Sequence, residues 1–156
     1  MKRGLSLFAA AVSIAAGFAA ADAGPVDVRI CAGLDEAVPP GGGPVLLVFF
    51  STECAVCFDD LFESRYLVDK GRWPVAVVGV ASGLREDLRA FLEKHAWTLP
   101  VVLDRRKVLF RRFDAGAVPF KVLISGRTAV YRDDPYRSPG ERREELERCL
   151  IRLFTH

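Results

Sequence analysis

Two unbroken apolar runs stand out in the pattern of hydrophobic and polar positions along the chain. The first is Val45–Phe50, and the second covers residues 74–81, where Gly79 is the only residue without a side chain. Runs that are apolar at every position are typical of strands buried on both faces of a sheet. Each run is followed by apolar residues at helical spacing, within residues 58–68 and 84–95. The pattern therefore predicts two buried strands that alternate with helices.

Weaker patterns predict the remaining elements. We expect a short strand at residues 26–30, a loop at 39–44 and another short strand at 100–103. A short helix at 108–113, the two strands of a hairpin at 122–125 and 128–131, and a C-terminal helix at 146–153 follow. Strands that alternate with helices and end in a hairpin predict an α/β fold, with a central mixed β-sheet flanked by helices.

The N-terminus has the pattern of a signal peptide. Lys2 and Arg3 precede an apolar segment, residues 5–21, that ends in small residues. A basic start, an apolar stretch and a small-residue cleavage site predict a signal peptide over residues 1–23, cleaved near residue 21 or 23. The alternative is an uncleaved membrane anchor, for which the run is slightly short and poor in large apolar residues. Both interpretations place residues 24–156, predicted to be one domain, in an exported, oxidising compartment such as the periplasm.

Composition excludes one class of partner. Cleavage after residue 21 removes Lys2 and Arg3 and leaves 20 basic residues against 20 acidic ones. The arginines are interleaved with acidic residues, so no basic face for nucleic acid is expected.

The chemistry of the chain is concentrated in Cys54-Ala55-Val56-Cys57. This motif lies between the first predicted buried strand and the helix that follows it. A thiol at the N-terminus of a helix is favoured as the thiolate, and the second thiol, one turn further on, is close enough to form a disulfide. We therefore expect Cys54 to attack a partner disulfide and Cys57 to resolve the product.

A zinc half-site or two merely buried cysteines are the alternatives for this pair. A structural zinc site usually needs four ligands, and the sequence has no second Cys/His pair at ligand spacing. Two thiolates alone would suit Cu(I). We expect no bound metal and no cofactor apart from the redox-active cysteine pair.

The motif and two later segments resemble the thioredoxin superfamily, and within it the exported TlpA-like or redoxin-type branch. The resemblance covers roughly residues 45–131 and is carried by the sequences at residues 45–57, 99–104 and 117–124, namely VLLVFFSTECAVC, LPVVLD and AVPFKVLI. It implies a thioredoxin-like fold with a TlpA-like strand–helix insertion between the Cys-x-x-Cys helix and a cis-proline. A peroxiredoxin would usually have Pro-x-x-x-Thr/Ser-x-x-Cys; Ser51 fits this pattern, but Leu47 occupies the proline position.

The resemblance also implies a function. It makes the chain a thiol–disulfide oxidoreductase with a Cys54–Cys57 disulfide, a cis bond before Pro119, and a backbone at Val118 and Pro119 that pairs with a substrate peptide. Its partners would be cysteine-containing exported proteins. As a reductant it would serve cytochrome c maturation or copper-site cysteines and draw electrons from a membrane thiol donor. The alternative function is a thiolate module that binds and delivers copper.

Four positions near the cysteine pair affect what the resemblance implies about its redox chemistry. Many relatives have Trp where this chain has Glu53, and thioredoxin has a buried acid where this chain has Val48. Asp59 and Asp60 fall in the first turn of the predicted helix, where we expect them to be exposed. Acidic neighbours disfavour a thiolate at Cys54, and a less stabilised thiolate makes a couple more reducing.

Cys31 and Cys149 leave two interpretations open. Cys149 lies on the apolar stripe of the C-terminal helix, which favours a buried, inert thiol. A structural disulfide between the two is the alternative, because an exported chain with four cysteines can form a second bond.

Overall fold

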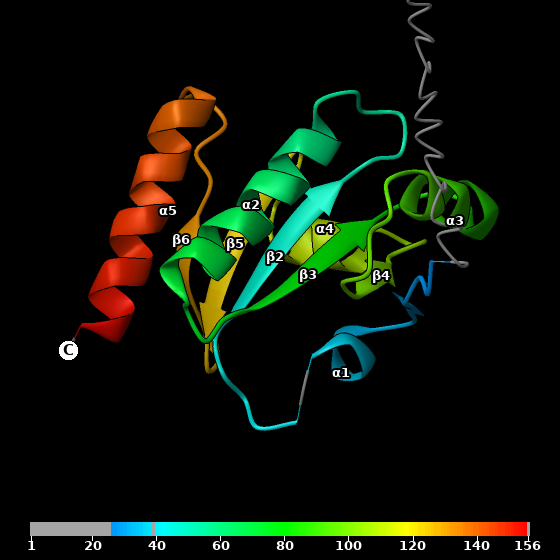
Figure 1. The fold of residues 1–156 in the computed structure, drawn as a ribbon. Coiled ribbons are helices and arrows are strands. Elements are labelled where there is room, and N and C mark those ends of the chain that lie inside the picture. Colours follow the sequence, from blue (N-terminus) through cyan, green and yellow to red (C-terminus); the bar gives the residue numbers. More distant parts are fainter. Residues whose placement is uncertain (1–25, 39, 156) are drawn as a thin grey trace, which may run out of the picture.

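The computed structural model describes residues 26–38 and 40–155, so the predicted signal peptide lies outside the described residues. The strands are β1 (Ile30–Cys31), β2 (Val45–Phe50), β3 (Ala76–Ala81), β4 (Val101–Leu103), β5 (Phe120–Ser125) and β6 (Thr128–Arg132). The helices are α1 (Leu34–Ala37), α2 (Cys57–Gly71), α3 (Arg85–Lys94), α4 (Val108–Arg112) and α5 (Pro139–Phe154). Figure 1 shows their arrangement.

The strands form one mixed sheet in the order β1-β4-β3-β2-β5-β6. Strands β1, β4, β3 and β2 are parallel, whereas β5 runs antiparallel to β2, and β6 runs antiparallel to β5. Strand β2 therefore lies inside the sheet, with neighbours on both sides. The prediction of a central mixed sheet flanked by helices is confirmed.

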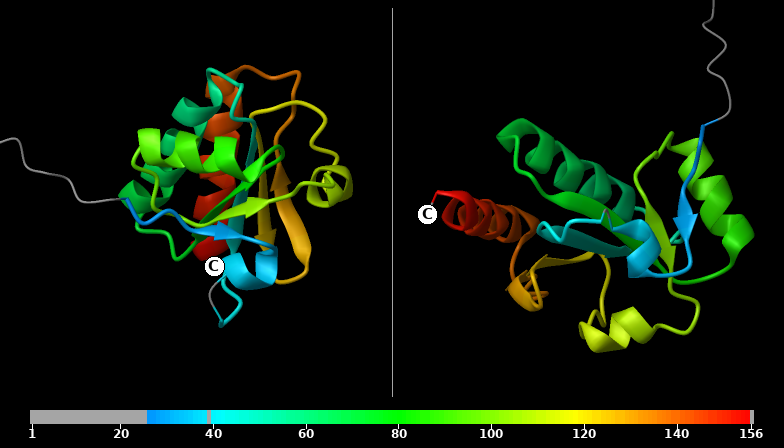
Figure 2. Two further views of the ribbon diagram at one scale, coloured as in Figure 1. Left: turned by 90° about the vertical axis from the view of Figure 1, so that its right-hand side faces the viewer. Right: turned by 90° about the horizontal axis from the view of Figure 1, so that it is seen from below.

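The apolar run of β2 is explained by burial on both of its faces. Alternate residues Leu46, Val48 and Phe50 belong to the core cluster that includes residues of α2, α3 and α5. The residues between them belong to a second cluster that includes residues of α1 and α4. Because side chains of a strand alternate between faces, both sets must be apolar. The two layers of helices are visible in Figure 2.

Strand β4 and helix α4 form a strand–helix unit between α2 and the cis-proline, where the insertion was predicted, and Asp104 fixes the start of α4. The Asp104 carboxylate accepts hydrogen bonds from the N–H groups of Val108 (2.8 Å), Leu109 (2.7 Å) and Phe110 (3.0 Å). The first N–H groups of a helix have no partner within the helix, and a carboxylate there also complements the helix dipole. Asp104 is buried and serves the local structure of the insertion.

Several predicted boundaries were wrong. The first strand is Ile30–Cys31 and not residues 26–30, because only these two residues pair with β4. Helix α1 was not predicted, because a helix of four residues has no periodic pattern to detect. Helix α5 begins at Pro139, earlier than its apolar stripe indicates, behind a capping box formed by Ser138 and Glu141.

Within residues 26–38 and 40–155, no helix is long and apolar enough to cross a membrane.

The role of Asp104 gives a first prediction. Asp104→Ala removes the acceptor for three helix N–H groups and should lower the free energy of unfolding by about 1–2 kcal/mol. Asp27→Ala, at an exposed position, is the control and should change it by less than about 0.5 kcal/mol. Urea unfolding followed by circular dichroism measures both. Equal stability of the two variants would contradict the role of Asp104.

Candidate active site

Cys54 and Cys57 form a disulfide at the end of β2, with their Cα atoms 5.4 Å apart. The turn that carries them is held by two backbone hydrogen bonds: the Cys54 N–H donates to the Ser51 carbonyl (3.1 Å), and the Cys57 N–H donates to the Cys54 carbonyl (3.2 Å). Helix α2 begins at Cys57. The second cysteine, and not the first as the sequence predicted, is thus the first residue of the helix, and Cys54 lies in the preceding turn.

The two cysteines differ in exposure. Cys57 is completely buried, whereas Cys54 is half-buried, and the intervening Val56 is 60% exposed. The cysteine that the sequence predicts to attack is thus the more exposed of the two, and the one predicted to resolve the product is buried.

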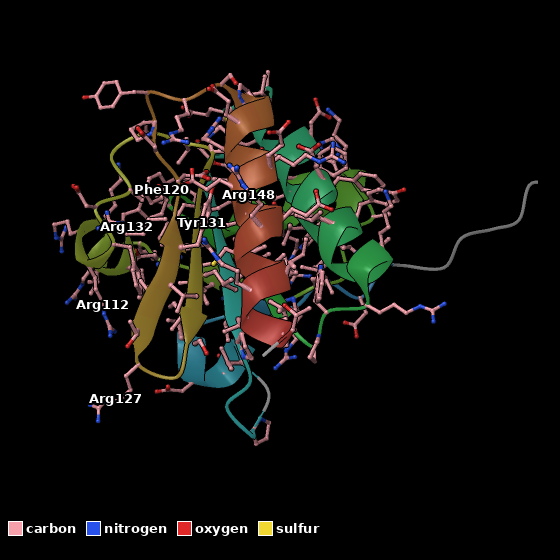
Figure 3. All side chains as sticks on the ribbon, turned by 90° about the vertical axis from the view of Figure 1, so that its left-hand side faces the viewer. Arg112, Phe120, Arg127, Tyr131, Arg132 and Arg148 are labelled. Carbon is pink, nitrogen blue, oxygen red and sulfur yellow. A yellow bond between two sulfur atoms is a disulfide. The ribbon has the colours of Figure 1, made fainter. Side chains whose placement is uncertain are left out.

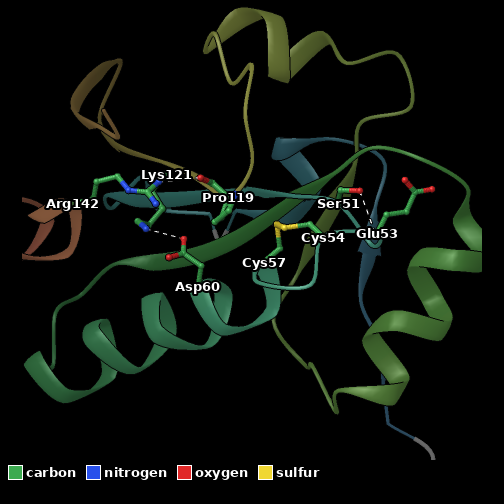
Figure 4. Close-up of a disulfide and its surroundings, with 8 residues drawn as sticks. All are labelled: Ser51, Glu53, Cys54, Cys57, Asp60, Pro119, Lys121 and Arg142. Atoms are coloured by element: carbon green, nitrogen blue, oxygen red, sulfur yellow. Dashed lines mark hydrogen bonds and ion pairs between the residues drawn. A yellow bond between two sulfur atoms is a disulfide. The ribbon is translucent and has the colours of Figure 1, made fainter. Parts of the chain in front are cut away.

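The Val118–Pro119 peptide bond is cis, as the resemblance implies. Register places this bond beside the disulfide. Phe120 is the Cα partner of Phe49 in the antiparallel pair of β5 and β2, so Pro119 lies level with Phe50, at the start of the cysteine turn. Figure 4 shows Pro119 next to the two sulfurs.

A buried cluster of charged side chains lies under this site. The Lys121 ammonium contacts the Asp60 carboxylate (2.8 Å) and the Asp133 carboxylate (3.5 Å), and the Arg142 guanidinium also contacts Asp133 (3.3 Å). Two cations and two carboxylates give the cluster no net charge. A buried charge is stable only when it is paired and hydrogen-bonded, so these four side chains hold one another in place.

The buried cluster is also bonded to the cis-proline segment. Arg142 Nη1 donates to the Pro119 carbonyl (3.2 Å), and the Lys121 N–H donates to the Asp133 carboxylate (2.9 Å). The Tyr131 hydroxyl contacts the same carboxylate. Burial, and then the hydrogen bond to Asp133, raise the pKa of Tyr131 well above its usual range, so the phenol stays protonated. Since Asp60 lies one turn after Cys57 in α2, the cluster joins the cysteine helix to Pro119.

Sequence reasoning missed this cluster. Asp60 was expected to be exposed, which is wrong: it is buried against Lys121, whereas its neighbour Asp59 is exposed. The one sequence feature that could have indicated the cluster is Lys121, a single charged residue in an otherwise apolar strand. Val48, which stands where thioredoxin has a buried acid, is the Cα partner of Lys121, so the buried charge is on the neighbouring strand.

The other residues singled out in the sequence lie outside the cysteine pair and the buried cluster. Cys31 and Cys149 are both free and buried, and they belong to core clusters on opposite faces of the sheet, so the predicted alternative of a bond between them is wrong. Burial raises the pKa of the Cys31 thiol. His95 stacks on Phe58 with 3.9 Å between ring centroids. Glu53 is exposed, as expected.

This sheet order, with Cys-x-x-Cys at the start of a helix and a cis-proline beside it, defines a thioredoxin-like protein of the thiol–disulfide oxidoreductase class. The sequence leads to a family within that fold. Residues 34–132 match the AhpC/TSA family, and the chain belongs to it.

Solved structures show the same fold. A secreted disulfide oxidoreductase of Mycobacterium tuberculosis, homologous to Escherichia coli DsbE, is 18% identical with a TM-score of 0.55, over 71% of this chain and 82% of that one. StoA of Bacillus subtilis is 19% identical with a TM-score of 0.57, over 71% and 84%. The thioredoxin domain of a Bacteroides vulgatus thiol–disulfide oxidoreductase is 16% identical with a TM-score of 0.56, over 70% and 80%. No curated protein matches the sequence.

The buried cluster gives a second prediction. Lys121→Met leaves the Asp60 carboxylate buried without its cation and should lower the free energy of unfolding by about 3–5 kcal/mol. Arg89→Met, which breaks an exposed ion pair with Glu93, is the control and should lower it by less than about 1 kcal/mol. Urea unfolding of the oxidised proteins measures both. Similar small losses in the two variants would show that the cluster does not hold the site together.

Proposed function

We propose that the protein is an exported thiol–disulfide oxidoreductase that reduces disulfides of cysteine-containing partner proteins through Cys54 and Cys57. The observation that carries the proposal is the asymmetry of the pair: Cys54, beside the cis-proline, is partly exposed, and Cys57 is completely buried. Attack by an exposed thiol and resolution by a protected one require this arrangement.

The reaction proceeds in two exchanges. The Cys54 thiolate attacks one sulfur of the partner's disulfide, a mixed disulfide forms, and the partner's other sulfur leaves as a thiolate that takes up a proton. Cys57, as its thiolate, then attacks the Cys54 sulfur, closes the Cys54–Cys57 bond and releases the partner's second thiol. The partner gains two electrons and this protein loses two. A membrane thiol donor restores the dithiol.

Val118 and Pro119 position the partner in this scheme. The turn and loop hydrogen bonds among the described residues include none to the N–H or C=O of Val118, so both groups are open to an extended peptide. Pairing of these groups with the backbone next to the partner's cysteine would add a short strand beside Cys54. The partner's backbone is thereby aligned without any requirement on its side chains.

The charges near the pair support a reducing direction of electron flow. Glu53 and Asp59 are exposed on either side of the motif, and neither forms an ion pair within the described part of the chain. Their negative charge disfavours a thiolate at Cys54, which favours a reductant. Asp60 no longer contributes to this effect, because Lys121 neutralises it. A reductant in an exported compartment would serve cytochrome c maturation or the cysteines of a copper site.

The cysteine roles can be tested with single substitutions. Cys54→Ser should abolish the reduction of insulin disulfides by a dithiol donor, because it removes the attacking thiolate. Cys57→Ser should allow the attack but accumulate the mixed disulfide, seen by mass spectrometry under non-reducing conditions. Cys149→Ser, a control at a free buried thiol, should keep the activity. An active Cys54→Ser variant would exclude these roles, and tight Cu(I) binding without any exchange would favour the copper-delivery alternative.

Export is a separate prediction. The pattern of residues 1–23 supports it, and the similar M. tuberculosis protein is a secreted one. When the full chain is expressed in a bacterial host, it should be found outside the cytoplasm with a mature N-terminus at Asp22 or Gly24. Fractionation followed by N-terminal sequencing measures this. A chain that retains Met1 and stays tightly bound to the membrane would support the anchor instead.

A further inference from the structure

We propose that the β4–α4 insertion binds an acidic segment of the partner protein next to its reacting cysteine. The inference rests on the proposed function and adds a substrate preference to it: partner disulfides flanked by Asp or Glu are reduced faster than others. It depends on a set of cations that we call the basic insertion, namely Arg105, Arg106, Lys107, Arg111 and Arg112.

The charge of the basic insertion is not compensated within the described part of the chain. All of its cations are exposed, and none of them forms an ion pair among residues 26–38 and 40–155. Asp104, the acid that precedes these cations, is buried, and its carboxylate accepts hydrogen bonds from the N–H groups of α4. It therefore forms no ion pair with them. Like charges that are gathered on one short segment repel each other, so an anionic ligand would stabilise them.

The basic insertion borders the proposed active site. A cavity of about 550 Å³ is lined by Lys107 and Arg111 together with Ser51 and Val118. Ser51 accepts the hydrogen bond from Cys54 that shapes the cysteine turn, and Val118 precedes the cis-proline. A peptide that passes Val118 as it leaves the mixed disulfide therefore enters this cavity and meets the two cations.

The one acid in this cavity does not cancel the two cations. Asp114 contributes to the lining but is paired with Arg132 (3.8 Å). The Arg111 guanidinium donates to the Arg106 carbonyl (2.7 Å), which holds it over the turn before α4. With two cations and this one acid, the lining of the cavity keeps a net positive charge.

Positive charge continues beyond α4. A second cavity, of about 580 Å³, is lined by Arg85, Arg105, Arg106 and Arg112, and its one exposed acid is Asp35. Two cavities in which the cations outnumber the exposed acids suit an extended acidic polypeptide better than a flat anionic membrane, because a chain can enter a concave site. Complementary charge raises the rate at which the partner and this protein meet, and high salt would abolish this rate enhancement by screening the charges.

The test uses two synthetic peptides, each with one cysteine blocked as a disulfide with β-mercaptoethanol. They differ only in their flanks, which are aspartates in one and serines in the other. The reduced protein should react with the acidic peptide about tenfold faster than with the neutral one at low ionic strength. The preference should disappear as ionic strength rises from about 0.01 M to about 1 M. Chromatography of acid-quenched samples gives both rates.

Matched double variants identify the surface. Lys107→Gln/Arg111→Gln should lose the preference, whereas Arg148→Gln/Arg152→Gln removes the same charge from exposed positions of α5 and should keep it. Figure 3 shows Arg112, the last residue of α4, and Arg148 on α5, on either side of the β5–β6 hairpin. Urea midpoints equal to that of the unmodified protein confirm that both variants are folded.

Three results would overturn the proposal. Equal rates for both peptides in the unmodified protein would remove the preference but leave the proposed function intact. Equal losses in both double variants would show a general charge effect. Binding to phosphatidylcholine vesicles that contain phosphatidylglycerol, abolished by Lys107→Gln/Arg111→Gln while the peptide rates stay equal, would assign the surface to anionic lipid. Failure to react with either peptide would contradict the proposed function itself.

Discussion

The contact between Lys121 and Asp60 is the interaction on which the geometry of the site depends. Lys121 is on β5, two residues after the cis-proline, and Asp60 is one turn along the helix that begins at Cys57. Because neither charge is stable when buried alone, helix α2 and strand β5 must meet at this point. Lys121 also pairs with Asp133 in the segment after β6, and Asp133 pairs with Arg142 of α5. Arg142 in turn donates a hydrogen bond to the Pro119 carbonyl, so these elements are held together with the cis-proline.

This constraint explains why the two cysteines differ. Helix α2, held down on the sheet by Asp60 and by apolar residues such as Leu61, keeps its first residue, Cys57, in the core. Cys54 belongs to the turn outside the helix, so it remains accessible to a partner. The β4–α4 insertion lies next to that turn, with Asp104 fixing its helix and its cations left exposed. The cysteine turn and the cations of the β4–α4 insertion thus border the same cavity.

Much of this architecture could be predicted from the sequence. The bounds of β2 agree with its apolar run, because burial on both faces leaves no alternative pattern, and the motif order correctly gave the thioredoxin-like sheet and its insertion. The buried cluster could not be predicted, because its members come from segments far apart in the chain and their pairing depends on tertiary contacts. Asp60 and Asp59 look alike in sequence, and only the position of Lys121 distinguishes them. Helix α1 is too short for any periodicity.

The roles proposed for the two cysteines, Cys54 as the attacking thiol and Cys57 as the protected one, follow from their difference in exposure. Alkylation of the reduced, folded protein with limiting iodoacetamide, followed by mass mapping of the modified peptides, tests these roles most directly. The account predicts that label accumulates first on Cys54, while Cys57, Cys31 and Cys149 stay unmodified until the protein is unfolded. Faster labelling of Cys57 than of Cys54 would contradict the assignment of roles and the account of the site built on it.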